Sequence, residues 1–166
     1  MESQKSNIHT ISFLVANKPG VLVRVAQVFA RRGYNIDSLV VSATVNPKYS
    51  RMTITATGNV ETLEQIIKQS AKLIDVIHAS EHTGIDSVTR EFALFKVKCP
   101  SNKKTSIIKA LKNKAHVVDE HQSTLIIGKT GTTEDLDLLE TELKKFGIIE
   151  MVRSGKLVMA TGKETT

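Results

Sequence analysis

The residues best placed to do chemistry lie in one short segment, Asn17-Lys18-Pro19-Gly20, which separates a predicted strand from a predicted helix. Proline has a fixed φ and no amide proton, whereas glycine lets the backbone turn tightly and lets another molecule approach the main chain. The first turn of a helix exposes amide groups that have no partner within the helix, and its dipole favours negative charge. The segment therefore predicts a binding site for a carboxylate or a phosphate.

A second asparagine, Asn35, follows the same predicted helix. Asn17 and Asn35 each carry donors and an acceptor, so together they can bind both charged ends of a zwitterion. Leu22, Ile36 and Leu39 supply an aliphatic surface nearby. These features favour an amino acid with a branched apolar side chain, because a nucleotide would need more cationic groups at the turn. An ordinary strand-to-helix turn is the alternative interpretation of an isolated N-x-P-G motif.

The sequence shows no convergent set of catalytic residues. Serine, histidine and aspartate are present, but no G-x-S-x-G, G-x-G-x-x-G or Walker motif accompanies them. His78 and His82 are four residues apart, yet they straddle a predicted strand end without an HExxH motif, which argues against zinc. Asp37 is a lone carboxylate on a predicted strand, a position that more often faces solvent or an arginine. The chain is predicted to bind a ligand rather than to transform one.

Composition favours a cytoplasmic protein. The 166 residues are enough for one medium domain or two small ones, and with 4% aromatic residues any core should be aliphatic. No apolar run is long enough to cross a bilayer, and Met1–Asn7 lacks the apolar stretch of a secretory signal. The single cysteine, Cys99, excludes an internal disulfide and is expected to be a buried thiol in a strand.

The net charge of +6 raises the hypothesis of a nucleic-acid partner. Much of the excess lies in the second half of the chain, at Lys96, Lys98, Lys103, Lys104, Lys109, Lys112 and Lys114. Most of these lysines fall on a predicted helix whose other face carries Ile107, Ile108 and Leu111. A solvated helix face is the favoured explanation, and no nucleic-acid partner is expected.

The first half of the chain predicts strands and helices in the order βαββαβ. The expected strands are residues 8–16, 34–45, 51–57 and 73–80, and the expected helices are residues 20–32 and a segment starting at Glu61. The strand at 51–57 alternates, with Met52, Ile54 and Ala56 directed inward and three threonines directed to water.

The same order recurs after a polar segment. Residues 84–89 form a predicted linker between a domain over residues 1–83 and a second over residues 90–166. In the second domain, strands are expected at 91–99, 115–119 and 124–128, helices at 103–114 and 133–146, and one or two strands at 148–160, interrupted at Ser154-Gly155.

Two tandem βαββαβ units define an α+β fold of two ferredoxin-like domains, each a four-stranded antiparallel sheet with two helices on one face. Such a sheet has one bare face and exposed edges. Side-by-side pairing of two copies would cover them, so we expect a homodimer or a higher oligomer.

Several segments resemble the regulatory (small) subunit of acetolactate synthase, a member of the ACT-domain family. The resemblance is dense over residues 8–98 and thins over residues 100–146. It is carried by residues 11–25 (ISFLVANKPGVLVRV), 29–39 (FARRGYNIDSL), 50–54 (SRMTI), 63–69 (LEQIIKQ) and 72–76 (KLIDV), with later echoes at 88–91 (VTRE) and 152–155 (VRSG).

The resemblance implies that the first domain is an ACT domain that binds valine where two copies meet. The matching positions place Asn17, Lys18, Pro19, Gly20, Val21 and Leu22 of one subunit against the ligand, with Asn35 and Ile36 from the other. Related proteins often carry serine where Val23 stands, so sensitivity to valine could differ.

The resemblance also implies a partner, the thiamine-diphosphate-dependent catalytic large subunit, which condenses pyruvate with pyruvate or 2-oxobutyrate in branched-chain amino-acid synthesis. Thiamine diphosphate, Mg²⁺ and FAD are then expected on that subunit and no cofactor on this chain. The chain would activate the synthase and confer inhibition by valine, leucine or isoleucine, in the cytoplasm or, if plastid-encoded, in the plastid stroma. The alternative hypothesis is a free-standing amino-acid-responsive module acting on a transcription factor or RNA.

Overall fold

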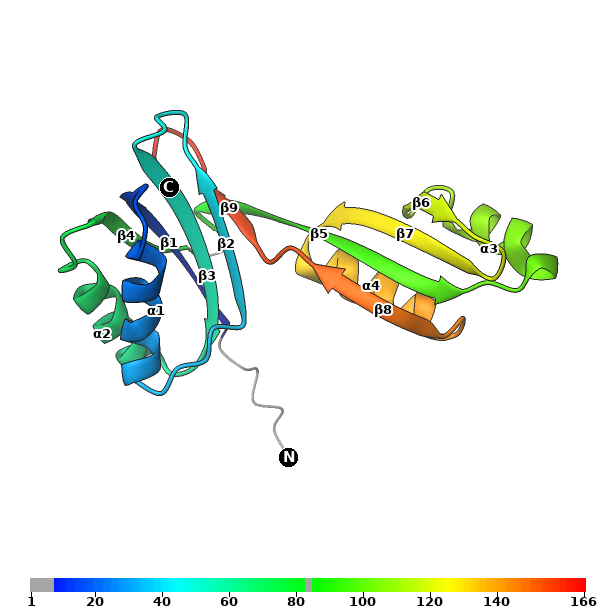
Figure 1. Ribbon diagram of the computed structural model, residues 1–166, viewed down its shortest axis with the longest axis horizontal. Helices are drawn as coiled ribbons and strands as arrows, with labels where there is room; N and C mark the ends of the chain where they lie inside the picture. The colour runs from blue at the N-terminus through cyan, green and yellow to red at the C-terminus, as the bar shows by residue number, and fades with distance from the viewer. Residues whose placement is uncertain (1–7, 83–84) are drawn as a thin grey trace. The chain divides into compact units, whose positions relative to one another are not determined.

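The computed structural model describes residues 8–82 and 85–166 (Figure 1). Met1–Asn7, Thr83 and Gly84, the last at the start of the predicted linker, lie outside the described residues. The chain divides into two compact units. One contains the residues up to 89 together with residues 155–166, and the other contains residues 90–154.

The first unit has the predicted order βαββαβ. Its elements are β1 (Ile8–Ala16), α1 (Val21–Arg31), β2 (Ser38–Ala43), β3 (Tyr49–Thr57), α2 (Val60–Ser70) and β4 (Val76–His82). The strands form an antiparallel sheet in the order β2-β3-β1-β4, and both helices lie on the same face of it (Figure 1).

Alternation along β1 and β3 explains why the two helices pack on this face. Ile11, Phe13 and Val15 of β1 are almost fully buried. The three residues of β3 that pair with them are buried as well. The helices supply the other half of the core through one apolar stripe each. The stripe residues are Val21, Val25, Val28 and Phe29 of α1 with Leu63 and Ile66 of α2.

The second strand is shorter than predicted, because β2 begins only at Ser38. The preceding residues are held by other contacts. The Tyr34 hydroxyl donates to the Asn59 carbonyl at 2.8 Å, and its ring lies so close to Gly58 that a Cβ there would be 2.2 Å from it. The amide of Asp37 donates to Thr55 O at 2.9 Å. The residues after α1 are therefore held by β3 and by the turn that follows it, before regular pairing between β2 and β3 starts.

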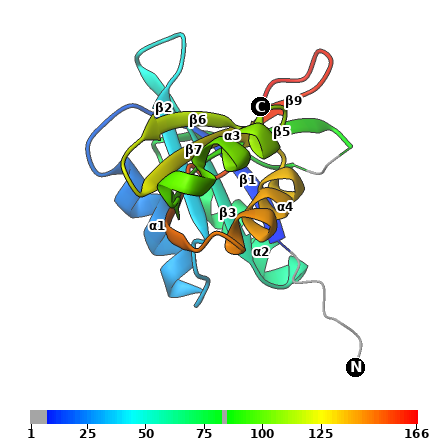
Figure 2. The same ribbon diagram turned by 90° about the vertical axis from the view of Figure 1, so that its right-hand side faces the viewer.

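The second unit repeats the pattern, and Figure 2 shows the same ribbon turned by 90° from Figure 1. Its elements are β5 (Ser87–Lys98), η1 (Ser101–Lys103), α3 (Lys104–Leu111), β6 (His116–Glu120), β7 (Thr124–Gly131), α4 (Thr133–Lys144) and β8 (Ile148–Arg153). The strand order is β6-β7-β5-β8. Ile107 and Leu111 of α3 pack with Leu136, Leu139 and Leu143 of α4 in one core, which also contains Cys99, buried as expected.

The last strand, β9 (Leu157–Ala160), pairs with β5. The predicted division assigned residues 90–166 to the second domain, whereas residues 155–166 cluster with the first unit in the structure. Gly155 is buried, and a Cβ there would be 3.0 Å from Ser38 Cβ. Part of the predicted linker is strand, because β5 begins at Ser87. None of the described helices is long and apolar enough to cross a membrane.

One prediction about which strand residues face water was wrong. It concerns β3, in the unit that also contains residues 155–166. Thr53 and Thr55 of β3 were expected to face water, but each is only 4% exposed. The Thr55 hydroxyl is 2.5 Å from that of Ser38, the same residue that Gly155 approaches. The polar face of the first sheet is therefore largely covered, and its hydroxyl groups bond to one another.

The start of α4 carries a capping box. The Thr132 hydroxyl accepts from the amide of Asp135 at 3.2 Å, and the Asp135 carboxylate accepts from the amide of Thr132 at 3.0 Å. These hydrogen bonds to Thr132 lower the pKa of Asp135. The contribution of this carboxylate to the free energy of unfolding is therefore complete above its ordinary pKa. This contribution is lost as the pH falls through the lowered pKa.

Replacement of Thr132 by alanine is expected to lower the free energy of unfolding by about 1 kcal/mol, because the first turn of α4 loses its acceptor. Urea denaturation measures the change. Thr141→Ala is the matched control, since Thr141 is exposed on the same helix and lies in its last turn, far from the N-cap. Equal destabilisation by both substitutions would contradict the capping role.

Candidate functional site

The turn between β1 and α1 presents unpaired main-chain donors. Gly20 occupies the N-cap of α1 with φ of 84°, and no side chain caps the helix. Its carbonyl accepts from the amide of Arg24 at 3.1 Å. Within the described part of the chain, the amides of residues 20–23 donate to no acceptor. The turn therefore has free N–H groups at the positive end of a helix dipole, an arrangement that suits a carboxylate.

Asn17 holds this turn to the connection between β2 and β3. Its amide donates to Lys48 O at 2.8 Å, and its side-chain Nδ2 donates to Pro47 O at 3.0 Å. The sequence suggested that both donors and the acceptor of this carboxamide could serve a ligand. In the structure, one donor is committed to the protein, and Oδ1 is the group best available to accept from an ammonium.

A buried carboxylate below the turn was not identified from the sequence. Asp75 precedes β4, and its side chain is 12% exposed. It forms an ion pair with Arg24 of α1 and lies 3.6 Å from Lys18 Nζ, while its carbonyl accepts from the amide of Ala16 at 2.8 Å. Asp75 thus attaches the turn to the rest of the domain at three points: the Ala16 amide, the Lys18 side chain and Arg24 of α1. The sequence signal that could have identified Asp75 is the position of an acidic residue within the apolar run LIDVI.

The predicted site residues differ in what they expose. Val21 is 3% exposed and its side chain belongs to the core, so only its main chain can face a ligand. Leu22 is 39% exposed, and Lys18 and Pro19 are exposed beside it. The free amides are therefore bordered by one aliphatic side chain and one ammonium group.

Asn35 and Ile36 do not meet this turn within one chain. They follow the C-terminal end of α1, whereas Gly20 caps its N-terminal end, and the helix has 11 residues. A helix of that length spans roughly 16 Å. Asn35 Nδ2 donates to Asp37 Oδ1 at 3.3 Å, and Asp37 Oδ2 accepts from Thr57 at 2.7 Å. Asp37 is exposed, as expected for this carboxylate. Within one chain, the two parts of the predicted site therefore lie at opposite ends of α1.

The histidines noted in the sequence form no metal-ligand cluster in residues 8–82 and 85–166. His82 Nε2 lies 2.7 Å from Ser12 Oγ, on the covered face of the first sheet. The pKa of His82 is lowered, mainly by burial. The positive charges of Arg51 and His78 lower this pKa further, whereas Asp86 raises it. A neutral, hydrogen-bonded histidine fits this position.

The first unit combines a βαββαβ fold with free amides at the β1–α1 turn, which is the arrangement of ACT-type regulatory domains. A family described as the ACT domain of acetolactate synthase (AHAS) small subunits matches residues 11–78. A second family, described as the small subunit of acetolactate synthase, matches residues 90–162. The chain belongs to the acetolactate synthase small-subunit family, which confirms the resemblance seen in the sequence.

Known relatives support this assignment over nearly the whole chain. A probable acetolactate synthase small subunit from Archaeoglobus fulgidus is 43% identical, over 94% of this chain and 98% of the relative. The acetolactate synthase small subunit from Mycolicibacterium smegmatis is 45% identical, over 93% and 91%. The crystal structure of the small subunit from Thermotoga maritima has a TM-score of 0.83 at 33% identity, covering 95% and 99% of the two chains.

Proposed function

We propose that this chain binds the catalytic large subunit of acetolactate synthase, activates it and makes it sensitive to valine or another branched-chain amino acid. The observation that carries the proposal is the row of free amides over residues 20–23, in a member of the small-subunit family. In this proposal the chain catalyses nothing itself. Thiamine diphosphate, Mg²⁺ and FAD belong to the large subunit, and the complex works in the cytoplasm.

The chemistry of the turn accounts for the class of effector. The α-carboxylate accepts from the amides of residues 20–23, while Asn17 Oδ1 and the Asn35 carboxamide bind the ammonium group. Leu22 and Ile36 contact the branched side chain. Valine, leucine and isoleucine differ by methylene groups, each worth about 1–3 kcal/mol of discrimination, so partial cross-reactivity is expected.

A homodimer completes the site. The edge strand β2 exposes Leu39 (37%) and Val41 (44%), and the first turn of α1 exposes Leu22 and Val23. Burying such apolar groups and pairing an edge strand both favour association of two copies. An antiparallel arrangement of two α1 helices would place the N-terminal turn of one copy near Asn35 of the other.

Linkage explains how the effector acts on the large subunit. Valine binds one arrangement of the paired ACT domains more tightly than another and so shifts the complex toward the less active state. A coupling free energy of roughly 1–3 kcal/mol is typical of such systems. The same coupling requires that the large subunit, in turn, alters the affinity for valine.

Reconstitution tests the proposal. The purified chain is mixed with the large subunit from the same source, and acetolactate formation is measured with and without valine. We expect the chain to raise the rate and valine to reduce it toward the rate of the large subunit alone. A rate unaffected by the chain would refute the proposed function.

The substitution Asn35→Ala is expected to weaken valine binding about tenfold, because a buried charged group of the ligand loses one hydrogen bond. Isothermal titration calorimetry on the full chain measures the affinity. Asn113→Ala, an exposed asparagine of the second unit, is the control and should leave the affinity unchanged. Unchanged affinity in Asn35→Ala would remove Asn35 from the site.

The alternative, a free-standing module that acts on a transcription factor or RNA, has less support. The small-subunit family matches both halves of the chain, including the basic second half on which the alternative depends. A pull-down distinguishes the two hypotheses, since the first predicts a thiamine-dependent partner and the second predicts salt-sensitive binding to nucleic acid.

A further inference from the structure

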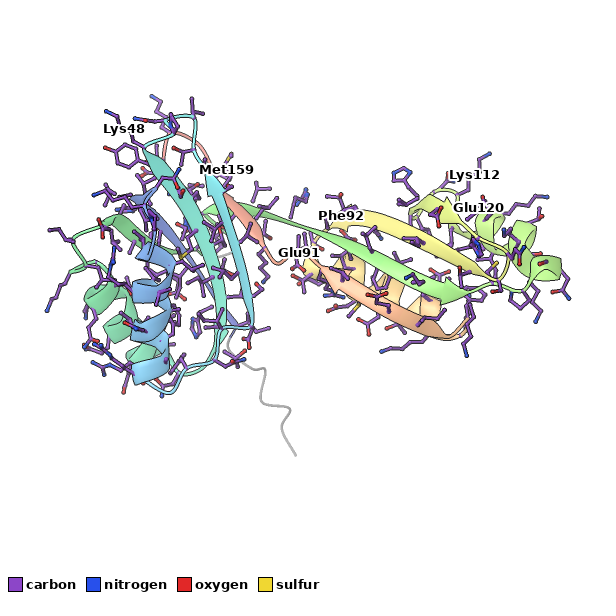
Figure 3. The ribbon with its side chains drawn as sticks, viewed as in Figure 1. Lys48, Glu91, Phe92, Lys112, Glu120 and Met159 are labelled. Carbon is purple, nitrogen blue, oxygen red and sulfur yellow. The ribbon has the colours of Figure 1, made fainter. Side chains whose placement is uncertain are left out.

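A cavity in the second unit has no role in the proposed effector site. It has a volume of about 250 Å³ and lies where the end of α3 meets β6 and β7. The cavity is lined by residues 112–116 and by Lys129 and Thr130 of β7. Figure 3 labels Lys112, which lies in the turn between α3 and β6. The amino-terminal ACT domain contributes nothing to this cavity.

The lining is cationic and contains no acidic side chain. Three lysines, Lys112, Lys114 and Lys129, are joined by His116 and by two polar side chains. Cavities of roughly 300 Å³ and more accommodate drug-sized ligands, so this one suits a small anion or one charged group of a larger molecule.

Among the described residues, only one of these three ammonium groups forms an ion pair. Lys114 Nζ lies 2.7 and 2.9 Å from the two oxygens of Glu142, which pairs it. Lys129 Nζ donates to the main-chain carbonyl of Asp135 at 3.2 Å, and among the described residues neither Lys112 nor Lys129 lies within ion-pair distance of a carboxylate.

Two carboxylates near the cavity respond to these cations. The hydrogen bond from Lys114 is the main cause that lowers the pKa of Glu142, and Lys145 and Lys129 act in the same direction. Lys129 also contributes to the lowered pKa of Asp135. The charge of Lys129 is therefore partly offset by these two carboxylates, and the rest is available to an anion in the cavity.

Compensation of the helix dipole explains only part of the arrangement. Lysines near a helix C-terminus interact favourably with its carbonyl groups, which accounts for Lys112 and Lys114 after α3. Lys129 comes from β7, at a different place in the chain, and has no helix end of its own to compensate. Its presence in the same lining as Lys112 points to a ligand whose charge is shared by both elements.

We propose that this cavity binds a phosphate group, either as inorganic phosphate or as the phosphoryl end of a small metabolite. Lys112 and Lys129 supply point charges, and the Asn113 amide and Thr130 hydroxyl supply neutral donors. Phosphate is favoured over a carboxylate because it presents more acceptor oxygens and a second negative charge to a wall that has several donors.

Calorimetry on the full chain tests the proposal with inorganic phosphate, pyrophosphate and AMP as separate probes. Lys112→Gln and Lys129→Gln should each weaken binding about tenfold or more, because each removes one charge-assisted hydrogen bond. Lys103→Gln is the matched control, since it removes the same charge from an exposed lysine at the other end of α3. Tighter binding of AMP than of phosphate would identify a metabolite, and the reverse would identify the free ion.

Amide shifts in ¹⁵N–¹H spectra of the unsubstituted chain give a second readout that does not depend on how the variants fold. Phosphate should shift the amides of residues 113–116 and 130. Three results would overturn the proposal: no binding at millimolar phosphate, equal weakening by all three substitutions, or tighter binding to an oligonucleotide with a steep salt dependence. Valine binding should be unchanged in Lys112→Gln and Lys129→Gln, so the two sites can fail independently.

Discussion

The Gly20→Asp variant is expected to activate the large subunit normally but to lose inhibition by valine. The new carboxylate would lie beside the free amides of residues 20–23, where the effector carboxylate is proposed to bind, and would repel it. A Cβ at Gly20 would be 3.3 Å from Arg24 Nη1, the end of a flexible side chain that needs to shift by only a few tenths of an ångström. Loss of two charge-assisted hydrogen bonds corresponds to an affinity lower by about 100-fold or more. Calorimetry with valine and the inhibition curve of the reconstituted enzyme both measure it.

Backbone strain in this variant requires a control. Gly20 has φ of +84°, so any side chain there costs roughly 1 kcal/mol or more of stability. Gly162→Asp adds the same charge at φ of +69°, in a position with no atom within 4 Å of a Cβ. This control should bind valine normally. Normal valine inhibition in Gly20→Asp, with its stability lowered as expected, would exclude the turn as the binding site.

The Asp75→Asn variant is expected to destabilise the first unit by about 2 kcal/mol. Removing one partner of a largely buried ion pair leaves the other charge without compensation, and the exposure of Arg24 (44%) reduces the penalty below that of a fully buried pair. The neighbouring Lys18 loses the same carboxylate. Urea denaturation of the full chain measures the change, and the hydrogen bond from Ala16 to the main chain of residue 75 should persist.

Glu64→Gln serves as the control for Asp75→Asn. Glu64 forms an ion pair with Lys68 one turn away on α2, at 3.4 Å, and its side chain is 57% exposed. Exposed pairs of this kind contribute about 0.3–0.5 kcal/mol. A stability loss in Asp75→Asn no larger than in Glu64→Gln would show that the carboxylate below the turn does not hold it.

The order of the elements and the effector turn could be predicted because local patterns encode them. Alternation along Ile11, Phe13 and Val15 requires one buried face, and Gly20 followed by an apolar stripe requires a helix start after a tight turn. The ion pair between Arg24 and Asp75 joins residues 51 positions apart, and no local pattern relates them. The same reason explains the approach of Gly155 to Ser38, which brings together residues from distant parts of the chain.

The composition of the site required the structure. Asn17 was expected to offer its whole carboxamide to a ligand, but the sequence does not show that Asn17 Nδ2 is bound to Pro47 O. Val21 illustrates the same limit, because a residue next to the turn can offer its amide while its side chain fills the core.

The most direct test of the account mixes two variants that are each expected to bind valine more weakly than the natural chain, Gly20→Asp and Asn35→Ala. If each site combines the turn of one copy with Asn35 of its partner, a mixed dimer contains one site with both substitutions and one site with neither. After subunit exchange in equal amounts, about a quarter of all sites should therefore bind valine with normal affinity. Calorimetry that detects these restored sites would support a shared effector site, and a mixture as insensitive to valine as its two components would contradict it.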